Sequence, residues 1–172
     1  MSKIGIIGGS GLDDPDILEG SSETSIKTPY GDPSSKIKEG KIEGQHVAIL
    51  SRHGIDHSIL PTNVNFRANI WALKKIGCTH ILASTAVGSL RNAIEPGHIV
   101  FPDQFIDFTK QRISTFYDED KVVHTPMAEP FCQSTIEILR ETATEMSIPN
   151  HFNKTIILSL IHISEPTRLG MI

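Results

Sequence analysis

The fold is decided at the start of the chain, where residues 3–11 read KIGIIGGSG. The β-branched isoleucines of this short apolar run predict a buried strand, and the glycines that follow end it abruptly. A tight glycine turn presents backbone N–H groups, and Ser10 adds a hydroxyl, so the turn can receive a small oxyanion. A purely structural glycine turn is an equally good interpretation of the stretch taken alone.

The turn does not match the two common nucleotide-binding loops. The dinucleotide fingerprint G-x-G-x-x-G requires a third glycine where Asp14 stands, and the carboxylate of Asp14 would repel a pyrophosphate. The P-loop pattern G-x-x-x-x-G-K-[ST] does not occur in the sequence. The anion expected at this turn is therefore a bare phosphate or a small phosphorylated ligand.

The composition fits one ordinary domain. The chain has 172 residues, 38% of them hydrophobic, and a net charge of -4 from 16 basic and 20 acidic residues. The charges are mixed along the chain, which argues against nucleic acid as a partner. Cys78 and Cys132 stand far apart, as is typical of reduced thiols in a cytoplasmic protein, with a single disulfide as the alternative. No apolar run is long enough to span a bilayer, so no membrane partner is expected.

The order of apolar runs predicts an α/β fold, a single domain with a central mixed, largely parallel sheet flanked by helices. Further strands are expected at residues 35–39, 45–51, 80–85 and 98–101 and from about residue 154. Glu43-Gly44 joins the first two as a hairpin, and a strand, helix and strand over residues 45–85 predict a parallel unit. Helices are expected over residues 64–76 and 131–146, and a long polar loop over residues 107–126.

The first of these helices has recognisable ends. Thr62 or Asn63 is the expected N-terminal cap, and Gly77 is a natural C-terminal stop. Residues three or four apart define its predicted buried stripe, which consists of Val64, Ala68, Trp71 and Lys75.

Three expected strand ends carry groups that suit an oxyanion: Gly9-Ser10, Arg52-His53 and Thr85-Ala86. Arginine offers a planar fork of donors that matches pairs of phosphate oxygens, and the neighbouring histidine adds a further donor. Thr85 contributes a hydroxyl and Ala86 an unobstructed backbone N–H. If the sheet brings these turns together, they form a pocket for one phosphate.

Each of these residues also has a simpler interpretation. Arg52 could pair with a surface acid, Ser84-Thr85 could be the polar end of a buried strand, and His124 could be a solvated loop residue. His53 and His57 have the H-x-x-x-H spacing of a zinc site, but no third ligand has convincing spacing, so we expect no metal.

Three long stretches, in the same order, resemble one known family. They are residues 3–15, KIGIIGGSGLDDP, residues 51–90, SRHGIDHSILPTNVNFRANIWALKKIGCTHILASTAVGSL, and residues 124–132, HTPMAEPFC. The chain resembles the methylthioadenosine phosphorylases of the trimeric purine nucleoside phosphorylase family over residues 3–157. The resemblance implies the nucleoside phosphorylase fold, incomplete at its C-terminus, and a homotrimer for the complete protein.

The family binds its nucleophilic phosphate at the corresponding turns. The resemblance therefore implies a phosphate site made of Ser10, Arg52, His53, Thr85 and Ala86. It also implies that His57 lies close to the phosphate and that His124 faces the ribose or the 5′ end of a nucleoside in a neighbouring subunit.

The reaction implied by the resemblance is phosphorolysis of 5′-methylthioadenosine to adenine and 5-methylthioribose 1-phosphate, with inorganic phosphate as co-substrate and no cofactor. Phosphate attacks the sugar as the purine leaves through an oxocarbenium-like state, so much of the catalysis is positioning. The family's acid for the leaving purine, an aspartate, belongs to a region that this chain lacks. We interpret Asp103 and Asp107 as structural.

Residues 158–172 depart from the family pattern. Where the family continues with a G-P-R-F segment and its base site, the chain reads LSLIHISEPTRLGMI, which looks like translated sequencing-adapter sequence. We expect residues 1–157 to be the N-terminal part of a nucleoside phosphorylase domain and residues 158–172 to be non-native, with a divergent natural terminus as the alternative. A sheet with an uncovered edge and face predicts a chain that is unstable or aggregates and does not catalyse phosphorolysis.

Other functions stay open at this point. The residues that select the base lie outside the matching stretches, so a phosphorylase for purine nucleosides or methylthioinosine is the nearest rival. A non-catalytic domain that binds phosphate or a nucleoside is the rival from another class. An α/β domain with purely structural glycine turns is a third.

Overall fold

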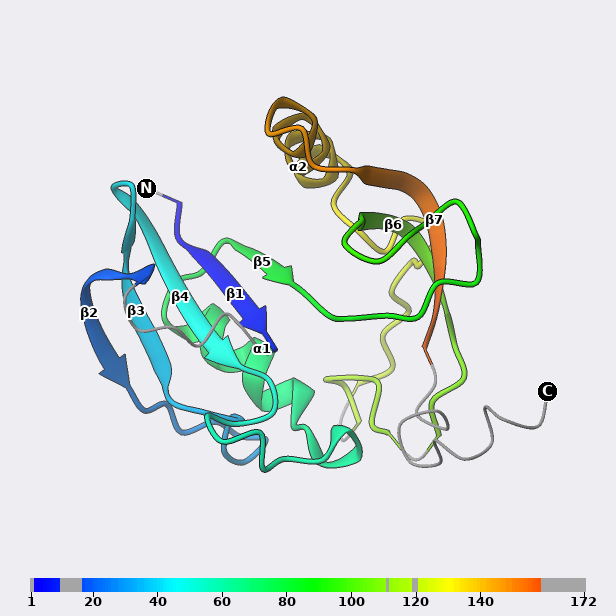
Figure 1. The fold of residues 1–172 in the computed structure, drawn as a ribbon. Coiled ribbons are helices and arrows are strands. Elements are labelled where there is room, and N and C mark those ends of the chain that lie inside the picture. Colours follow the sequence, from blue (N-terminus) through cyan, green and yellow to red (C-terminus); the bar gives the residue numbers. More distant parts are fainter. Residues whose placement is uncertain (1, 10–16, 111, 119–120, 159–172) are drawn as a thin grey trace. The chain divides into compact units, whose positions relative to one another are not determined.

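The structure, a computed structural model, describes residues 2–9, 17–110, 112–118 and 121–158. These residues fall into two compact units, one within Met1–Ala86 and the other within Val87–Ile172. Each unit has its own sheet and its own helix (Figure 1). None of the described helices is long and apolar enough to cross a membrane.

The first unit is built on a five-stranded sheet with the strand order β2-β3-β4-β1-β5 (Figure 1). Its strands are β1 (Ile4–Gly8), β2 (Glu19–Thr24), β3 (Ile37–Ile42), β4 (Gln45–Ser51) and β5 (His80–Ala83). β1 lies between β4 and β5 and is parallel to both, whereas β3 pairs antiparallel with β2 and β4. The predicted α/β class and mixed sheet are confirmed, although antiparallel pairings are as frequent as parallel ones in this unit.

Two turns that the glycines predict are confirmed. The hairpin between β3 and β4 turns at Glu43 and Gly44, which both have positive φ angles, of 50° and 79°. Gly77, with a φ of 90°, follows the end of the helix α1 (Phe66–Lys75). Glycine reaches such angles without steric cost, so these turns are encoded locally. β2 was not predicted because its sequence, EGSSET, is polar and has no apolar alternation.

α1 connects β4 to β5 across β1. Its cap is Asn65, whose side-chain oxygen accepts a hydrogen bond from the Ala68 N–H at 3.2 Å. The prediction that Thr62 or Asn63 caps the helix is wrong, because Pro61–Asn63 forms a separate 3-10 helix that ends before α1 begins.

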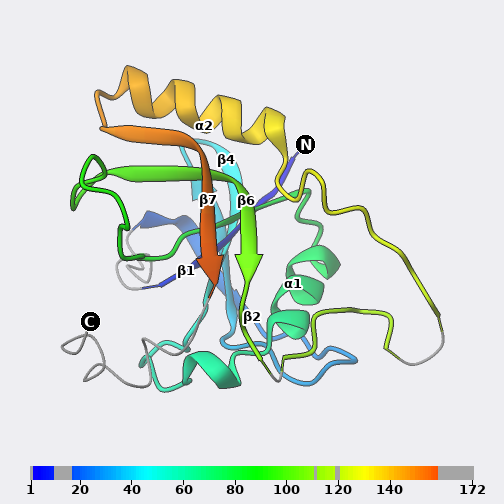
Figure 2. The ribbon, with the colours of Figure 1, turned by 90° about the vertical axis from the view of Figure 1, so that its right-hand side faces the viewer.

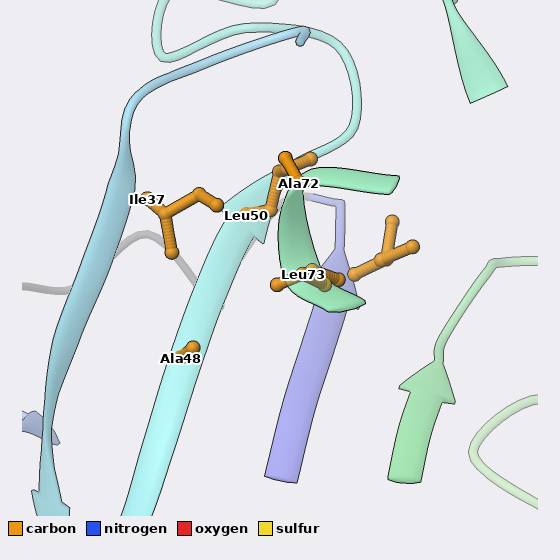
Figure 3. Close-up of a cluster of buried hydrophobic side chains, with 6 residues drawn as sticks. Ile37, Ala48, Leu50, Ala72 and Leu73 are labelled. Carbon is orange, nitrogen blue, oxygen red and sulfur yellow. The ribbon is translucent and has the colours of Figure 1, made fainter. Parts of the chain in front are cut away.

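The core of the first unit lies between α1 and one face of the sheet. Figure 3 shows this cluster, in which side chains of the strands meet those of the helix: Ile7, Ile37, Ala48, Leu50, Ala72 and Leu73. Gly5 makes room for the helix, because a Cβ at this position would lie 3.2 Å from Cδ1 of Leu73. The sheet and helix are therefore held together mainly by apolar burial.

The buried residues of α1 are Ala68, Asn69, Ala72 and Leu73. The predicted stripe is right for Ala68 and, just before the helix, for the buried Val64. It is wrong for Lys75, which is exposed, and for Trp71, which is only half-buried and has the Lys75 ammonium 5.9 Å from its ring centroid. The helix instead presents to the sheet the face that carries Leu73, since Leu73 fits against Gly5.

The second unit contains a parallel pair of strands, β6 (Ile99–Asp107) and β7 (Asn150–Leu158), and the helix α2 (Gln133–Glu145). Figure 2 shows the two strands side by side and running in the same direction. Phe105 meets Phe131 edge to face at a centroid distance of 6.1 Å, and the Arg140 guanidinium lies 4.8 Å from the Phe152 centroid. α2 confirms the helix predicted over residues 131–146.

β6 differs from its prediction in length. The strand continues past residue 101 and ends at Asp107, the residue at which the predicted polar loop begins. Asp103 lies inside the strand, and the Asp107 carboxylate accepts a hydrogen bond from the Thr109 N–H at 2.8 Å. The described strands form two sheets where the sequence predicted one, because every described pairing of β6 is with β7.

Candidate functional site

Three chain segments meet where β4, β1 and β5 end. Parallel strands end at the same edge of a sheet, so the residues that follow them are brought together. The Arg52 N–H donates to the Gly8 carbonyl at 2.9 Å, and the Ser84 N–H donates to the Ile7 carbonyl at 3.1 Å. These two bonds extend the ladders of β1 on both sides by one residue. The segments after β4 and β5 are thereby fixed on either side of the end of β1.

The side chain of Arg52 spans this edge. Its Nη2 donates to the Ser84 carbonyl and lies 3.5 Å from the Ile7 carbonyl. The guanidinium is half-buried, and burial lowers the pKa of Arg52 below its ordinary value. Among the described residues it forms no ion pair. A partly desolvated cation held by carbonyls, with no described acid to neutralise it, suits an anionic ligand better than a surface ion pair.

His53 is held by the loop that follows it. Its Nδ1 lies 3.0 Å from the Ile59 carbonyl, and the Ile59 N–H donates to the His53 carbonyl at 3.0 Å. The His57 ring is stacked on the His53 ring, with 6.3 Å between the ring centroids and 21° between the planes. The structure therefore places His53 and His57 together, one residue and five residues after Arg52.

α1 supports the end of β4 through a polar network. Asn69 is fully buried, and its amide makes two hydrogen bonds with Ser34. Its Oδ1 accepts from the Ser34 N–H at 2.8 Å, and its Nδ2 donates to the Ser34 hydroxyl at 2.9 Å. The next hydroxyl, Ser35 Oγ, accepts from the Ser51 N–H at 3.0 Å. A buried amide is costly unless it is hydrogen-bonded, so Asn69 fixes the segment that supports Ser51.

The other residues of the predicted site differ in how they are placed. Thr85 and Ala86 follow Ser84 at the same edge and are exposed; Thr85 Oγ1 lies 3.4 Å from the Ala86 carbonyl. Ser10 lies outside the described residues. His124 is exposed and belongs to the second unit. No group of three or more metal-binding side chains occurs in the described part of the chain.

Sequence reasoning did not find the two carbonyls that hold the site's side chains, those of Ser84 and Ile59. A backbone carbonyl is present at every residue and carries no compositional signal. The buried Asn69 was also missed, although a polar residue on the apolar face of a predicted helix is a signal that could have revealed it.

The model of the family described as the phosphorylase superfamily matches residues 3–168. The chain belongs to the phosphorylase superfamily. The family resemblance and the fold class predicted from the sequence are thereby confirmed.

Several members of this superfamily are closely similar to the chain. The S-methyl-5'-thioadenosine phosphorylase of Danio rerio is 56% identical over 160 residues, which are 90% of this chain and 57% of the relative. The protein of the same name from Hyperthermus butylicus is 51% identical over 156 residues, 91% of this chain and 57% of the relative. The chain thus spans a little over half the length of these curated relatives.

Solved structures of the superfamily share the fold. A double mutant of the adenosine/methylthioadenosine phosphorylase from Schistosoma mansoni, in complex with adenine, has a TM-score of 0.86 and 40% identity, covering 91% of this chain and 63% of that one. The methylthioadenosine phosphorylase from the same organism, in complex with tubercidin, has a TM-score of 0.86 and 38% identity, covering 96% of this chain and 71% of that one.

Proposed function

We propose that this chain forms the phosphate-binding part of a methylthioadenosine phosphorylase. The observation that carries the proposal is the half-buried Arg52 guanidinium, anchored to backbone carbonyls beside His53 with no described acid to neutralise it. The names of the most similar curated relatives support the reaction, and the adenine and tubercidin complexes of similar structures support a purine nucleoside as the second substrate.

In this proposal the two substrates react by phosphorolysis. Arg52 binds the phosphate oxygens. Further contacts come from His53 and from the two residues after Ser84, Thr85 and Ala86. Ser10 completes the site from the first glycine turn. Bound phosphate attacks the sugar carbon while the bond to adenine breaks, giving adenine and 5-methylthioribose 1-phosphate. Holding the anion in line with that bond supplies much of the rate enhancement.

The assembly and cofactor requirements are parts of the same proposal. We infer a homotrimer in which His124 of one subunit approaches the nucleoside of its neighbour, working in the cytoplasm without a cofactor. The preference for a 6-aminopurine over a 6-oxopurine rests on the names and ligands of the similar proteins.

The reaction is tested in a completed protein, which consists of residues 1–157 followed by the part of the Danio rerio relative that lies beyond its match with this chain. Phosphate-dependent release of adenine from methylthioadenosine is expected, with much slower release of hypoxanthine from methylthioinosine. Faster reaction of the 6-oxopurine would favour the rival phosphorylase, and phosphate binding without turnover of any nucleoside would favour a non-catalytic binding domain.

The phosphate site is tested in the same protein with a matched pair of arginine substitutions. Arg52→Ala removes charge-assisted hydrogen bonds, so the KM for phosphate should rise about tenfold or more. Arg67→Ala is the control, because it removes an arginine side chain of α1 whose guanidinium lies 4.7 Å from the Tyr30 ring centroid. This substitution should leave the KM for phosphate within about twofold of the unsubstituted value. Equal effects of the two substitutions would contradict the assignment of Arg52.

A further inference from the structure

The imidazole of His53 has one nitrogen committed to the protein. Its Nδ1 lies 3.0 Å from the carbonyl oxygen of Ile59. A carbonyl oxygen can only accept a hydrogen bond, so the nitrogen that faces it must carry the proton. In a neutral imidazole the other nitrogen, Nε2, then has a free electron pair and acts as an acceptor.

We propose that the Ile59 carbonyl fixes His53 as the Nδ1–H tautomer and that Nε2 meets the phosphate as a hydrogen-bond acceptor, so that the bound anion is a protonated phosphate. This inference rests on the proposed function, because it concerns the same anion site. It makes Ile59 a positioning residue, which acts on the phosphate through His53, and it defines the preferred ligand as a tetrahedral oxyanion that carries a hydrogen.

The loop between the two residues is shaped to bring the carbonyl to the ring. Gly54 and His57 have positive φ angles, of 78° and 51°. Two hydrogen bonds of 3.3 Å close successive turns: the Gly54 N–H donates to the Ser51 carbonyl, and the His57 N–H donates to the Gly54 carbonyl. The Ile59 N–H then returns to the His53 carbonyl at 3.0 Å. His53 and Ile59 are thus joined by two hydrogen bonds, one from the backbone and one from the ring, which define the ring's orientation.

The neighbouring cation explains why an acceptor is useful beside an anion. Arg52 has only donors, and it attracts phosphate and sulfate alike through its charge. An acceptor at Nε2 gains a hydrogen bond only from an anion that brings a hydrogen, as hydrogen phosphate does. A fully ionised sulfate leaves that acceptor unpaired and places its oxygens against a lone pair, which is unfavourable. Arg52 therefore supplies affinity for anions, and His53 supplies the choice among them.

Two substitutions separate the two ring nitrogens. In His53→Asn the side-chain amide nitrogen can take the place of Nδ1 and keep the bond to Ile59, but nothing replaces Nε2. In His53→Gln the longer side chain places its amide near the position of Nε2 and gives up the bond to Ile59. We expect His53→Asn to weaken the binding of inorganic phosphate about tenfold and His53→Gln to retain more of it.

Binding is measured by calorimetric titration of inorganic phosphate, and separately of sulfate, into the full 172-residue chain and into the completed protein. Unsubstituted protein should bind phosphate about tenfold more tightly than sulfate, and His53→Asn should remove most of this difference. His46→Asn, an exposed histidine on β4, is the matched control and should change neither affinity. Equal affinities for the two anions in the unsubstituted protein would overturn the proposal.

A second measurement does not depend on anion binding or on catalytic activity. Heteronuclear NMR of the anion-free protein distinguishes a protonated ring nitrogen from an unprotonated one, and His53→Asn identifies the His53 signals by their loss. Protonated Nδ1 with unprotonated Nε2 is the expected result, and the opposite tautomer would refute the inference.

If Arg52→Ala leaves phosphate binding unchanged, the proposed site itself fails. If Arg52 is required and His53→Asn binds like the unsubstituted protein, only this inference fails.

Discussion

The Nη2 of Arg52 donates a hydrogen bond to the carbonyl oxygen of Ser84, although the two residues are 32 positions apart in the sequence. The bond crosses the end of β1, because β1 lies between the strands that the two residues follow. One part of the guanidinium thus holds the edge of the sheet together. Its other N–H groups make no further hydrogen bond to any residue that the structure describes, which suits the binding of an anion.

This double use predicts that lysine cannot replace Arg52. An ammonium group is a single point of charge without the fork of donors, so it can bind the carbonyl or the anion but not both in one fixed geometry. Arg52→Lys in the completed protein should raise the KM for phosphate about tenfold while the fold is preserved. Steady-state kinetics with circular dichroism as the fold control would check this, and a KM equal to that of the unsubstituted protein would show that charge alone suffices.

The core predicts a strong dependence of stability on Leu73. This side chain is fully buried against β1, and Leu73→Ala should lower the free energy of unfolding by about 3 kcal/mol through lost burial and a residual cavity. Ile70→Ala, on the exposed side of the same helix, should cost less than about 1 kcal/mol. Urea denaturation of the completed protein measures both, and similar losses at the two positions would mean that α1 does not cover the sheet.

A charged cluster at the other end of the sheet predicts a pH dependence of stability. Burial raises the pKa of Glu39, but hydrogen bonds from Lys3 and Thr24 and the charge of Lys3 outweigh it, so the pKa lies below its ordinary value of 4.5. The unfolded chain therefore binds a proton at this carboxyl more readily than the folded one. The stabilisation is present above the ordinary pKa and is lost as the pH falls through the folded value.

Glu39→Gln cannot titrate and tests this sign. At pH 7 the unsubstituted protein should be the more stable of the two by about 1 kcal/mol, and the difference should shrink as the pH falls below 4.5. Urea midpoints at a series of pH values measure it. A difference that stays constant or grows on acidification would contradict the expectation.

The two cysteines should differ in reactivity. Hydrogen bonds from the hydroxyls of Ser134 and Thr135, both 3.2 Å from the sulfur, lower the pKa of the exposed Cys132 to about 7. Burial raises the pKa of the Cys78 thiol. Because the thiolate is the nucleophile, iodoacetamide near pH 7 should alkylate Cys132 at least about tenfold faster than Cys78. Mass spectrometry of the peptides follows both sites, and Ser134→Ala with Thr135→Val should slow the reaction at Cys132 alone.

The second unit predicts poor solubility of the 172-residue chain by itself. Of its described hydrophobic residues only Ala143 is buried, while β6 and β7 expose the large apolar side chains of Ile99, Ile106, Phe152 and Ile157. Exposed apolar strands associate with one another. Light scattering should therefore show aggregates of the chain at concentrations at which the completed protein is dispersed, and equal scattering of the two would disprove this.

Local sequence determined the elements whose residues have distinctive backbone or burial preferences. The isoleucines around Gly5 defined β1, Glu43-Gly44 defined a hairpin, and Gly77 marked the end of α1, because these preferences act within a few residues of the chain. The local sequence pattern was less reliable where it allowed two different capping residues or two different buried faces for the same helix. Asn65 rather than Asn63 caps the helix, and Leu73 rather than Trp71 faces the sheet, since contacts with distant residues select between them.

The sequence by itself determined which side chains could bind an anion, because Arg52 and His53 stand where a strand gives way to a polar loop. Only the tertiary structure decided what holds them, the carbonyls of Ser84 and Ile59. The physical reason is that a carbonyl group belongs to every residue alike. Its role depends on where the folded backbone carries it, and no residue type records that position in advance.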